Sequence, residues 1–235
     1  ALHEDIAPGG QKATLTLADG SVILLDSIGK GPLSLQGGVV VEKLDDGQIV
    51  YRPADVKSEE IFYSTMTTPK GGQYQLQLPD GTAVWLNAAS SITYPISFAG
   101  NSRTVSITGE AYFEVVKDKN KPFIVKTIKD EIVVTGTSFN INSYADEPVS
   151  KTTLIEGEVR INDRILQPGE AYLNGKVIKT DVDQDVAWKN GVFNFDDKKL
   201  EEIMRQLSRW YNIDVVYEKE VPNMEFFGKM GRDLT

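Results

Sequence analysis

The sequence predicts a mainly β domain followed by a small α+β domain. Between about residues 11 and 181, short runs of alternating apolar and polar residues are separated by turn residues, as is typical of antiparallel strands. After residue 185 the period changes, because apolar residues recur at helical spacing between residues 200 and 211. The first part, made of stacked short strands, fits a sandwich or a solenoid-like fold, and the second part fits a βαβ unit.

Asp-Gly pairs mark the turns that connect neighbouring strands. Residues 14–17 lead into Asp19-Gly20, and residues 21–25 form the return strand. Asp and Gly tolerate the positive φ angles of a type I′ hairpin turn, so we expect that turn here. The pattern is repeated at Asp80-Gly81, where residues 76–78 and 82–87 flank the turn.

Further echoes indicate repeated β units. Gly-Gly-Gln precedes both Asp-Gly turns, at residues 9–11 and 71–73, and Gly-Glu-Ala-Tyr occurs at residues 109–112 and 169–172. These repeats favour stacked units, whereas their uneven spacing fits a twisted sandwich of short antiparallel strands equally well. In either architecture one face of each strand is directed to the core. The expected inward-facing residues are Val105, Ile107, Tyr112, Phe113, Val115, Phe123, Val125, Ile132, Val134, Phe139, Ile141, Leu154, Ile155, Val159 and Ile161.

The C-terminal part predicts a strand, a helix and a second strand. Residues 192–195 form the first strand, Asp196 or Asp197 caps the helix, and Asn212 follows its last residue. Residues 213–217 alternate as the second strand. We expect a truncated domain, because this unit leaves the apolar face of the helix with little to cover it; Asp233 or Thr235 would then cap a further helix. The apolar face of the helix, which runs from about residue 198 to residue 211, comprises Leu200, Ile203, Met204, Leu207, Trp210 and Tyr211.

Composition limits the classes of function. With 25 Lys and Arg against 34 Asp and Glu, the net charge of -9 opposes binding to nucleic acid or to an anionic membrane surface. Cys is absent, which removes disulfides, thiol nucleophiles and thiolate metal sites. The single histidine, His3, lies too near the end of the chain to serve a Ser-His-Asp triad. The longest apolar runs, such as residues 22–25, fall far short of the roughly 18 residues of a membrane span.

Two groups of carboxylates suggest chemistry but fit a structural role better. Asp181, Asp183 and Asp185 have the spacing of a calcium loop, but valine occupies positions 186 and 192, where that loop needs Gly and Glu. We therefore expect a solvated linker there. Glu110 and Glu114 share a strand face and would suit a glycosidase, although such pairs are usually solvated.

Aromatic residues leave one alternative open. Tyr74, Trp85, Tyr94 and Tyr112 could stack on sugar rings, yet aromatic residues in sheets are more often core or cross-strand pairs. A carbohydrate-binding module remains the alternative function, and a carboxylate-based glycosidase is a weaker one. We predict no catalytic residue, no cofactor and no metal site.

Several motifs resemble the FecR family of anti-sigma regulators as it occurs in Bacteroidetes-like bacteria. None is diagnostic alone, and their order and number carry the resemblance. The motifs are residues 67–73 (TTPKGGQ), 78–82 (LPDGT), 84–91 (VWLNAASS), 109–115 (GEAYFEV), 121–125 (KPFIV), 136–141 (GTSFNI) and 154–159 (LIEGEV).

A second set of motifs resembles the C-terminal domain of this family, which is similar to the short signalling domain of secretins and TonB-dependent transporters. These motifs are residues 188–191 (WKNG) and 203–211 (IMRQLSRWY). The resemblance divides the chain into an N-terminal β hairpin region (1–63), a FecR-type β domain (64–186) and a partial secretin/TonB short N-terminal-like domain (187–235).

The resemblance implies the periplasmic sensor region of a transmembrane anti-sigma regulator. Such a protein relays a signal, by protein-protein binding, from a TonB-dependent outer-membrane transporter to an extracytoplasmic-function sigma factor. A cytoplasmic sigma-binding segment and one membrane helix are then expected before Ala1, tethering the protein to the inner membrane. The expected partner of this chain is the N-terminal signalling domain of the transporter. The residues expected to bind it are Arg205 and Arg209, on the exposed side of the helix, and the open strand of Ile213, Asp214, Val215, Val216 and Tyr217.

Overall fold

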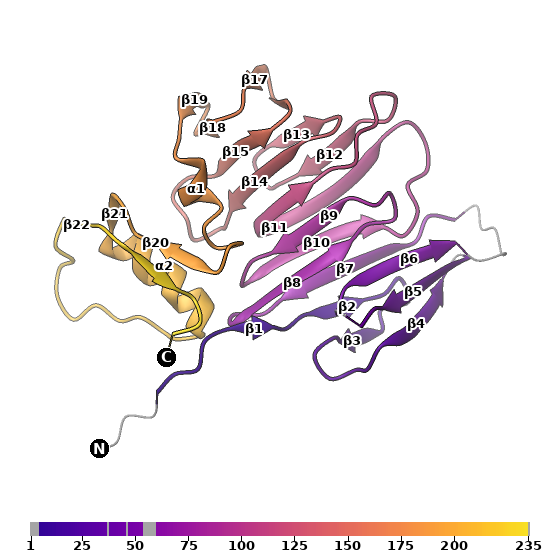
Figure 1. The fold of residues 1–235 in the computed structure, drawn as a ribbon, viewed down its shortest axis with the longest axis horizontal. Coiled ribbons are helices and arrows are strands. Elements are labelled where there is room, and N and C mark those ends of the chain that lie inside the picture. Colours follow the sequence, from indigo (N-terminus) through magenta and orange to yellow (C-terminus); the bar gives the residue numbers. More distant parts are fainter. Residues whose placement is uncertain (1–4, 37, 46, 54–59, 235) are drawn as a thin grey trace.

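The computed structural model describes residues 5–36, 38–45, 47–53 and 60–234. Within these ranges nineteen strands belong to one sheet that curls into two facing leaves, which together we call the slab. Residues 192–234, the C-terminal lobe, pack beside the slab (Figure 1). The fold is mainly β with a small helical part near the C-terminus, which confirms the predicted fold class. His3 lies outside the described residues.

Both leaves consist of short strands. The first leaf contains β2 (Thr14–Thr16), β3 (Val22–Leu24), β7 (Tyr63–Thr68), β10 (Ser90–Pro95), β12 (Phe123–Lys126), β13 (Glu131–Val134), β16 (Val159–Ile161) and β17 (Arg164–Leu166). The second leaf contains β4 (Gly31–Gln36), β5 (Val39–Lys43), β6 (Ile49–Pro53), β8 (Gly72–Gln77), β9 (Ala83–Leu86), β14 (Ser138–Ser143), β15 (Lys151–Glu156), β18 (Glu170–Leu173) and β19 (Lys176–Lys179). The short strand β1 (Gly10–Gln11) pairs in parallel with β8.

One long strand joins the two leaves. β11 (Arg103–Glu114) pairs with β10 and β12 through its first half and with β9 and β14 through its second half. It changes leaf at Gly109, whose φ is 80°. A Cβ atom at Gly109 would lie 2.4 Å from Oγ of Ser90, so this crossing requires glycine.

The hairpins alternate between the leaves. β8 and β9 pair in the second leaf, β12 and β13 in the first, β14 and β15 in the second, and β16 and β17 in the first. Stacking of successive hairpins is the feature expected of a solenoid, and two facing leaves are the feature expected of a sandwich. The structure therefore combines the two architectures that the sequence left open.

Asp19 and Asp80 stabilise equivalent turns. Each carboxylate accepts a hydrogen bond from the backbone N–H two residues later, at 2.9 Å for Asp19 and 3.1 Å for Asp80. In each turn only the following glycine has a positive φ, 82° at Gly20 and 87° at Gly81. The predicted type I′ turn is wrong, because it needs positive φ at both central residues. The chain instead makes a longer turn closed by a glycine bulge.

The core lies between the leaves and contains most of the residues expected there. Phe113, Phe123 and Phe139 are fully buried, and the rings of Phe113 and Phe139 stack with centroids 5.0 Å apart. Tyr112 is an exception, because it faces the outside of the second leaf and packs with Val186 and Trp188. The remaining expected residues belong to the main core, with Ile155 partly buried at its edge.

The C-terminal lobe contains one substantial helix and two small ladders. A single turn, α1 (Val182–Asp185), connects the slab to it. The lobe consists of β20 (Val192–Asn194), β21 (Lys198–Lys199), α2 (Leu200–Tyr211), β22 (Glu225–Phe226) and β23 (Lys229–Gly231). β20 pairs antiparallel with β23, and β21 pairs antiparallel with β22. None of the helices within the described ranges could cross a membrane.

The lobe differs from the predicted βαβ unit in two ways. Helix α2 begins after Lys199 instead of Asp196 or Asp197, whereas Asn212 ends it in the left-handed conformation, as expected. Residues 213–217 form no strand, because the position beside β20 is occupied by β23. Asp233 lies in a turn and caps no helix, and Thr235 lies outside the described residues.

Candidate functional site

The end of helix α2 rests on the start of β8. The N–H of Gly71 donates a hydrogen bond of 2.7 Å to the carbonyl oxygen of Arg209. At Gly9, a Cβ atom would come within 2.7 Å of the Trp210 ring. Slab and lobe therefore meet at positions that leave no room for larger side chains, and we call this contact the joint.

Trp210 covers much of the joint. Its side chain is 4% exposed and packs with Ala88 of the slab and Phe193 of the lobe. Its Nε1–H donates a hydrogen bond of 2.7 Å to the carbonyl oxygen of Arg232. Ile203, on the same helix, is also buried. The expectation that little would cover this face is wrong, because side chains of β20 and β23 in the lobe, together with Ala88 of the slab, pack against it.

Arg232 connects the lobe to the slab through its guanidinium group. The group lies 3.7 Å from the centre of the Trp210 ring and donates hydrogen bonds of 2.9 Å to the carbonyl oxygen of Trp188 and to Oδ1 of Asn87. Burial lowers the pKa of Arg232 to about 10, although the Glu110 carboxylate acts in the opposite direction. The side chain still carries its charge at neutral pH, so a cation is buried at the joint.

Glu110 supplies the opposite charge. Its carboxylate accepts hydrogen bonds from Nδ2 of Asn87, at 2.8 Å, and from Nδ2 of Asn140, at 3.1 Å. Burial raises the pKa of Glu110, and the two amide hydrogen bonds, Arg209 and Arg232 only partly offset that effect. The joint thus contains a carboxylate and a cation that are both removed from solvent.

The two glutamates proposed as a glycosidase pair lie in different environments. Glu110 is buried at the joint, whereas Glu114 is exposed and forms an ion pair of 3.3 Å with Lys189. Both point from the same face of β11, as the sequence predicts. The expectation that both are solvated is wrong for Glu110, because the lobe covers it.

Arg205 and Arg209 are not on an exposed face of the helix. Arg209 is 6% exposed, lies over the Tyr144 ring at 3.9 Å, and donates a hydrogen bond of 2.6 Å to Glu147. Arg205 donates a hydrogen bond of 2.9 Å to the same carboxylate. The expected exposure is therefore wrong, because both guanidinium groups bind the loop after β14. A role for them in partner binding stays a prediction.

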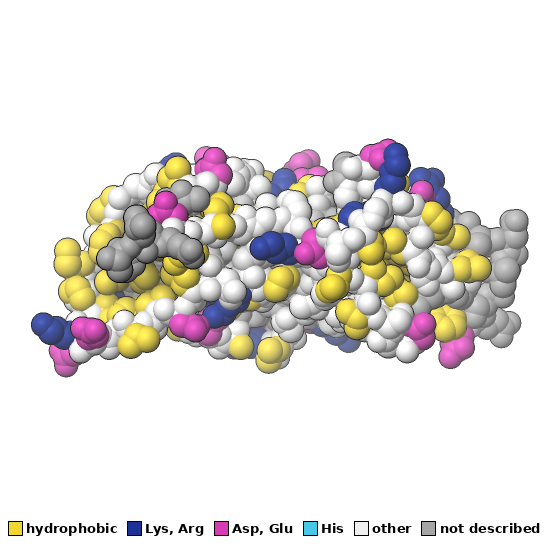
Figure 2. Space-filling model, turned by 90° about the horizontal axis from the view of Figure 1, so that it is seen from below, with side chains coloured by type: hydrophobic (Ala, Val, Ile, Leu, Met, Phe, Trp, Pro, Cys, Tyr) yellow, Lys and Arg dark blue, Asp and Glu magenta, His cyan; other side chains and the backbone are white. Residues whose placement is uncertain are grey.

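The rest of the expected partner site is open to solvent. Val216 is 84% exposed and Tyr217 is 45% exposed, while Ile213 and Val215 are partly covered. Further along the same stretch Phe227 is 69% exposed. Figure 2 shows apolar side chains gathered at the end of the molecule that the lobe occupies. We call residues 213–227 the exposed segment.

The aspartates that have the spacing of a calcium loop serve structural roles. Asp181 caps α1, and Asp185 forms an ion pair of 2.6 Å with Lys151, so this stretch is not the solvated linker that we expected. No cluster of carboxylates or histidine suited to a metal ion occurs within the described residues.

The four aromatic residues considered for sugar binding serve the slab. Tyr94 is fully buried and Tyr74 is 5% exposed. Trp85 and Tyr112 are a cross-strand pair with ring centroids 5.5 Å apart, and the ammonium group of Lys189 lies 4.3 Å from both rings. The ring faces of these residues therefore contact other residues of the same chain. This agrees with the expectation that aromatic residues in the sheet belong to the core or to cross-strand pairs.

Known proteins match both parts of the chain. The family described as FecR protein matches residues 64–160, and the family described as FecR, C-terminal matches residues 192–235. A crystal structure from Parabacteroides distasonis, provisionally named an anti-sigma factor, is 30% identical, with a TM-score of 0.67 over 72% of this chain and 84% of that one. This chain belongs to the FecR family. It is therefore a FecR-family anti-sigma factor, which is a regulatory protein.

A second crystal structure of an anti-sigma factor so named from the same organism agrees with this assignment. It is 29% identical, with a TM-score of 0.64 over 72% of this chain and 85% of that one. No curated protein matches this FecR-family chain.

Sequence reasoning missed most of the joint of this FecR-family protein. Asn87 and Glu110 lie inside motifs that carried the resemblance, so those motifs were the available signal. Arg232 and Tyr144 lie outside any motif, and only the tertiary fold brings them together. The hydroxyl of Tyr144 donates a hydrogen bond of 2.7 Å to the carbonyl oxygen of Ala88, and burial raises the pKa of Tyr144.

Proposed function

We propose that this FecR-family protein is the periplasmic sensor region of a membrane-tethered anti-sigma regulator. In this proposal it receives a signal from a TonB-dependent outer-membrane transporter and relays it to an extracytoplasmic-function sigma factor. The relay is by protein-protein binding, and the sigma factor is reached through a cytoplasmic segment that lies outside the present sequence. A helix upstream of Ala1 would attach the protein to the inner membrane.

The observation that carries the proposal is the exposed segment of the C-terminal lobe. Residues 213–224 belong to none of the ladders found among the described residues, yet Val216 and Met224 expose 84% and 55% of their surface. A stretch whose backbone forms no ladder and whose apolar side chains are exposed is suited to pairing with a strand of another protein. We propose that the N-terminal signalling domain of the transporter docks here.

The ion pairs of helix α2 support this choice of surface. Because Arg205 and Arg209 are bonded to Glu147, they hold the helix against the slab. The exposed segment follows that helix directly, so docking at Val216 would act on an element that is anchored at the joint. A partner that binds the exposed segment would in this way alter the contact between helix α2 and the slab.

The test is a calorimetric titration of the chain with the transporter signalling domain. Val216→Pro removes a backbone donor, and we expect it to weaken binding at least about tenfold, whereas Val216→Thr keeps the backbone donor and the branched shape and should bind nearly as the parent does. Ile128→Glu, at a site that is 74% exposed on the slab, is the matched control and should leave binding unchanged. Undiminished binding by Val216→Pro would rule out this docking site.

A further inference from the structure

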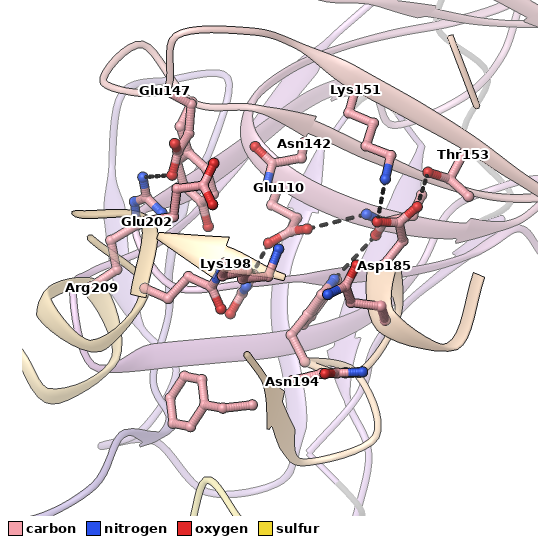
Figure 3. A pocket seen from close by; sticks show the side chains of 18 of the residues that line it. Glu110, Asn142, Glu147, Lys151, Thr153, Asp185, Asn194, Lys198, Glu202 and Arg209 are labelled. Carbon is pink, nitrogen blue, oxygen red and sulfur yellow. Dashed lines mark hydrogen bonds and ion pairs between the residues drawn. The ribbon is translucent and has the colours of Figure 1, made fainter. Parts of the chain in front are cut away.

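A cleft lies between the lobe and the outer face of the second leaf. Its volume is about 280 Å³, and residues of β11, β14, β15, α1, β20 and α2 line it. Figure 3 shows Glu110 between Asn142 and Asn194, with Lys151 and Asp185 on one side and Glu147 and Arg209 on the other. Ligand sites in proteins are frequently found between domains, and a cleft of this volume suits a small molecule.

Several residues that line this cleft carry a buried polar atom without a hydrogen-bond partner. Five buried side-chain atoms within the described ranges have no partner, and three of them belong to residues that line it. They are Oδ1 of Asn142, Nδ2 of Asn194 and Nε of Arg232. Asn194 and Arg232 are only 3% and 4% exposed. Leaving such atoms unpaired is unfavourable, so one acceptor and two donors here are available to a bound molecule.

The charges around the cleft cancel. Four carboxylates and four basic side chains line it. Several are already paired inside the cleft, since Lys151 lies 2.6 Å from Asp185 and Arg209 lies 2.6 Å from Glu147. A ligand with a net charge would therefore lose its hydration in a lining whose formal charges sum to zero. Besides Glu110 and Arg232, the charged lining residues are Glu147, Asp185, Glu202, Lys151, Lys198 and Arg209.

We propose that this cleft binds an uncharged, hydroxyl-rich small molecule of monosaccharide size. Each hydroxyl group both donates and accepts, so one such ligand can satisfy the acceptor of Asn142 together with the donors of Asn194 and Arg232. Asn142 belongs to the slab, whereas the other two belong to the lobe. The bound ligand would bridge the joint and hold the lobe on the slab. This site is separate from the exposed segment and differs from the aromatic surface considered from the sequence.

The test uses three sugars of one ring size that differ in charge. Glucose is neutral, glucuronate is anionic and glucosamine is cationic. We expect glucose to bind in calorimetric titrations and to raise the melting temperature, and both charged sugars to bind at least about tenfold more weakly. Equal or tighter binding of either charged sugar, or no binding of glucose, would overturn the proposal.

A matched pair of variants locates the site. Asn142→Leu keeps the size of the side chain but removes the free acceptor, and we expect it to weaken glucose binding about tenfold or more while folding is retained. Asn223→Leu, at an exposed position of the lobe, should bind glucose as the parent does. A crystal soaked in glucose supplies a second readout. If water alone occupies the three polar atoms there, or if both variants bind equally well, the cleft is only a hydration site.

Discussion

The slab and the C-terminal lobe are stabilised in different ways. The slab has a large apolar core between two leaves, and each hairpin pairs with a neighbour in a defined register. The lobe has two short ladders, and its own apolar cluster includes Ala88 from the slab. Buried ions and aromatic rings, above all Arg232 and Trp210, provide much of the remaining contact. The slab is therefore expected to fold independently, whereas order in the lobe depends on the joint.

This difference suggests how a signal can travel through the molecule. An apolar core resists small changes, because its stability comes from many equivalent contacts. A joint made from a few polar groups can be altered by one binding event, since each group has only a few partners. The exposed segment is attached to the part of the molecule that is easier to shift.

The largest expected effect comes from the core of the slab. Phe113→Ala removes a fully buried ring that stacks on Phe139, and we expect a loss of about 3–5 kcal/mol in the free energy of unfolding, measured by urea denaturation. Phe227→Ala, at a 69% exposed site in the lobe, is the control and should change stability by less than about 0.5 kcal/mol. Similar losses of unfolding free energy for the two variants would contradict the view that the apolar core of the slab provides most of the stability.

A smaller and local effect is expected at the joint. Arg232→Met removes the hydrogen bonds to Trp188 and Asn87 but also the cost of burying a charge, so we expect a net loss of about 1–3 kcal/mol in the free energy of unfolding. Hydrogen exchange should become faster in residues 192–234 while the slab strands keep their protection. Lys229→Met, an exposed position of β23, is the matched control. Equal acceleration in slab and lobe would contradict a separate joint.

The smallest effect concerns pH. Burial raises the pKa of Glu110 above its ordinary value of 4.5. The folded chain therefore holds this proton more tightly than the unfolded chain, so Glu110 adds stability below about pH 4.5 and loses that contribution as the pH rises through its folded-state pKa. The free energy of unfolding of the parent, minus that of Glu110→Gln, should increase as the pH is lowered from neutral. A difference that does not vary with pH would show that Glu110 is not desolvated.

Local sequence patterns predicted the secondary-structure elements better than they predicted which residues meet at the joint. Helix α2 follows from the spacing of Ile203, Leu207 and Trp210, and its end follows from Asn212, because both signals lie within a few residues. The strand expected at residues 213–217 failed because β23, from further along the chain, pairs with β20. Alternation in a short apolar run shows that a strand is possible, but it cannot show which segment takes the place beside another strand.

The charged residues of the joint could not be placed by pattern. Arg205 and Arg209 follow the polar spacing of an exposed helical face, and only the loop at Glu147 covers them. Glu110 alternates with core residues as a solvated side chain does, and only the lobe buries it. In each case the burying element is distant in sequence. Motif resemblance marked Asn87 and Glu110 as part of a family feature without showing what they contact.

The contact between Gly9 and Trp210 has a mechanical consequence. The chain enters the slab through β1, which pairs in parallel with β8 over two residues. Gly9, the residue just before β1, lies against the ring of Trp210. Tension along the N-terminal stretch would load this short ladder and the tryptophan before any longer strand of the slab. Because the same tryptophan seats helix α2, a pull from the N-terminal side and a partner bound to the exposed segment would strain one shared contact.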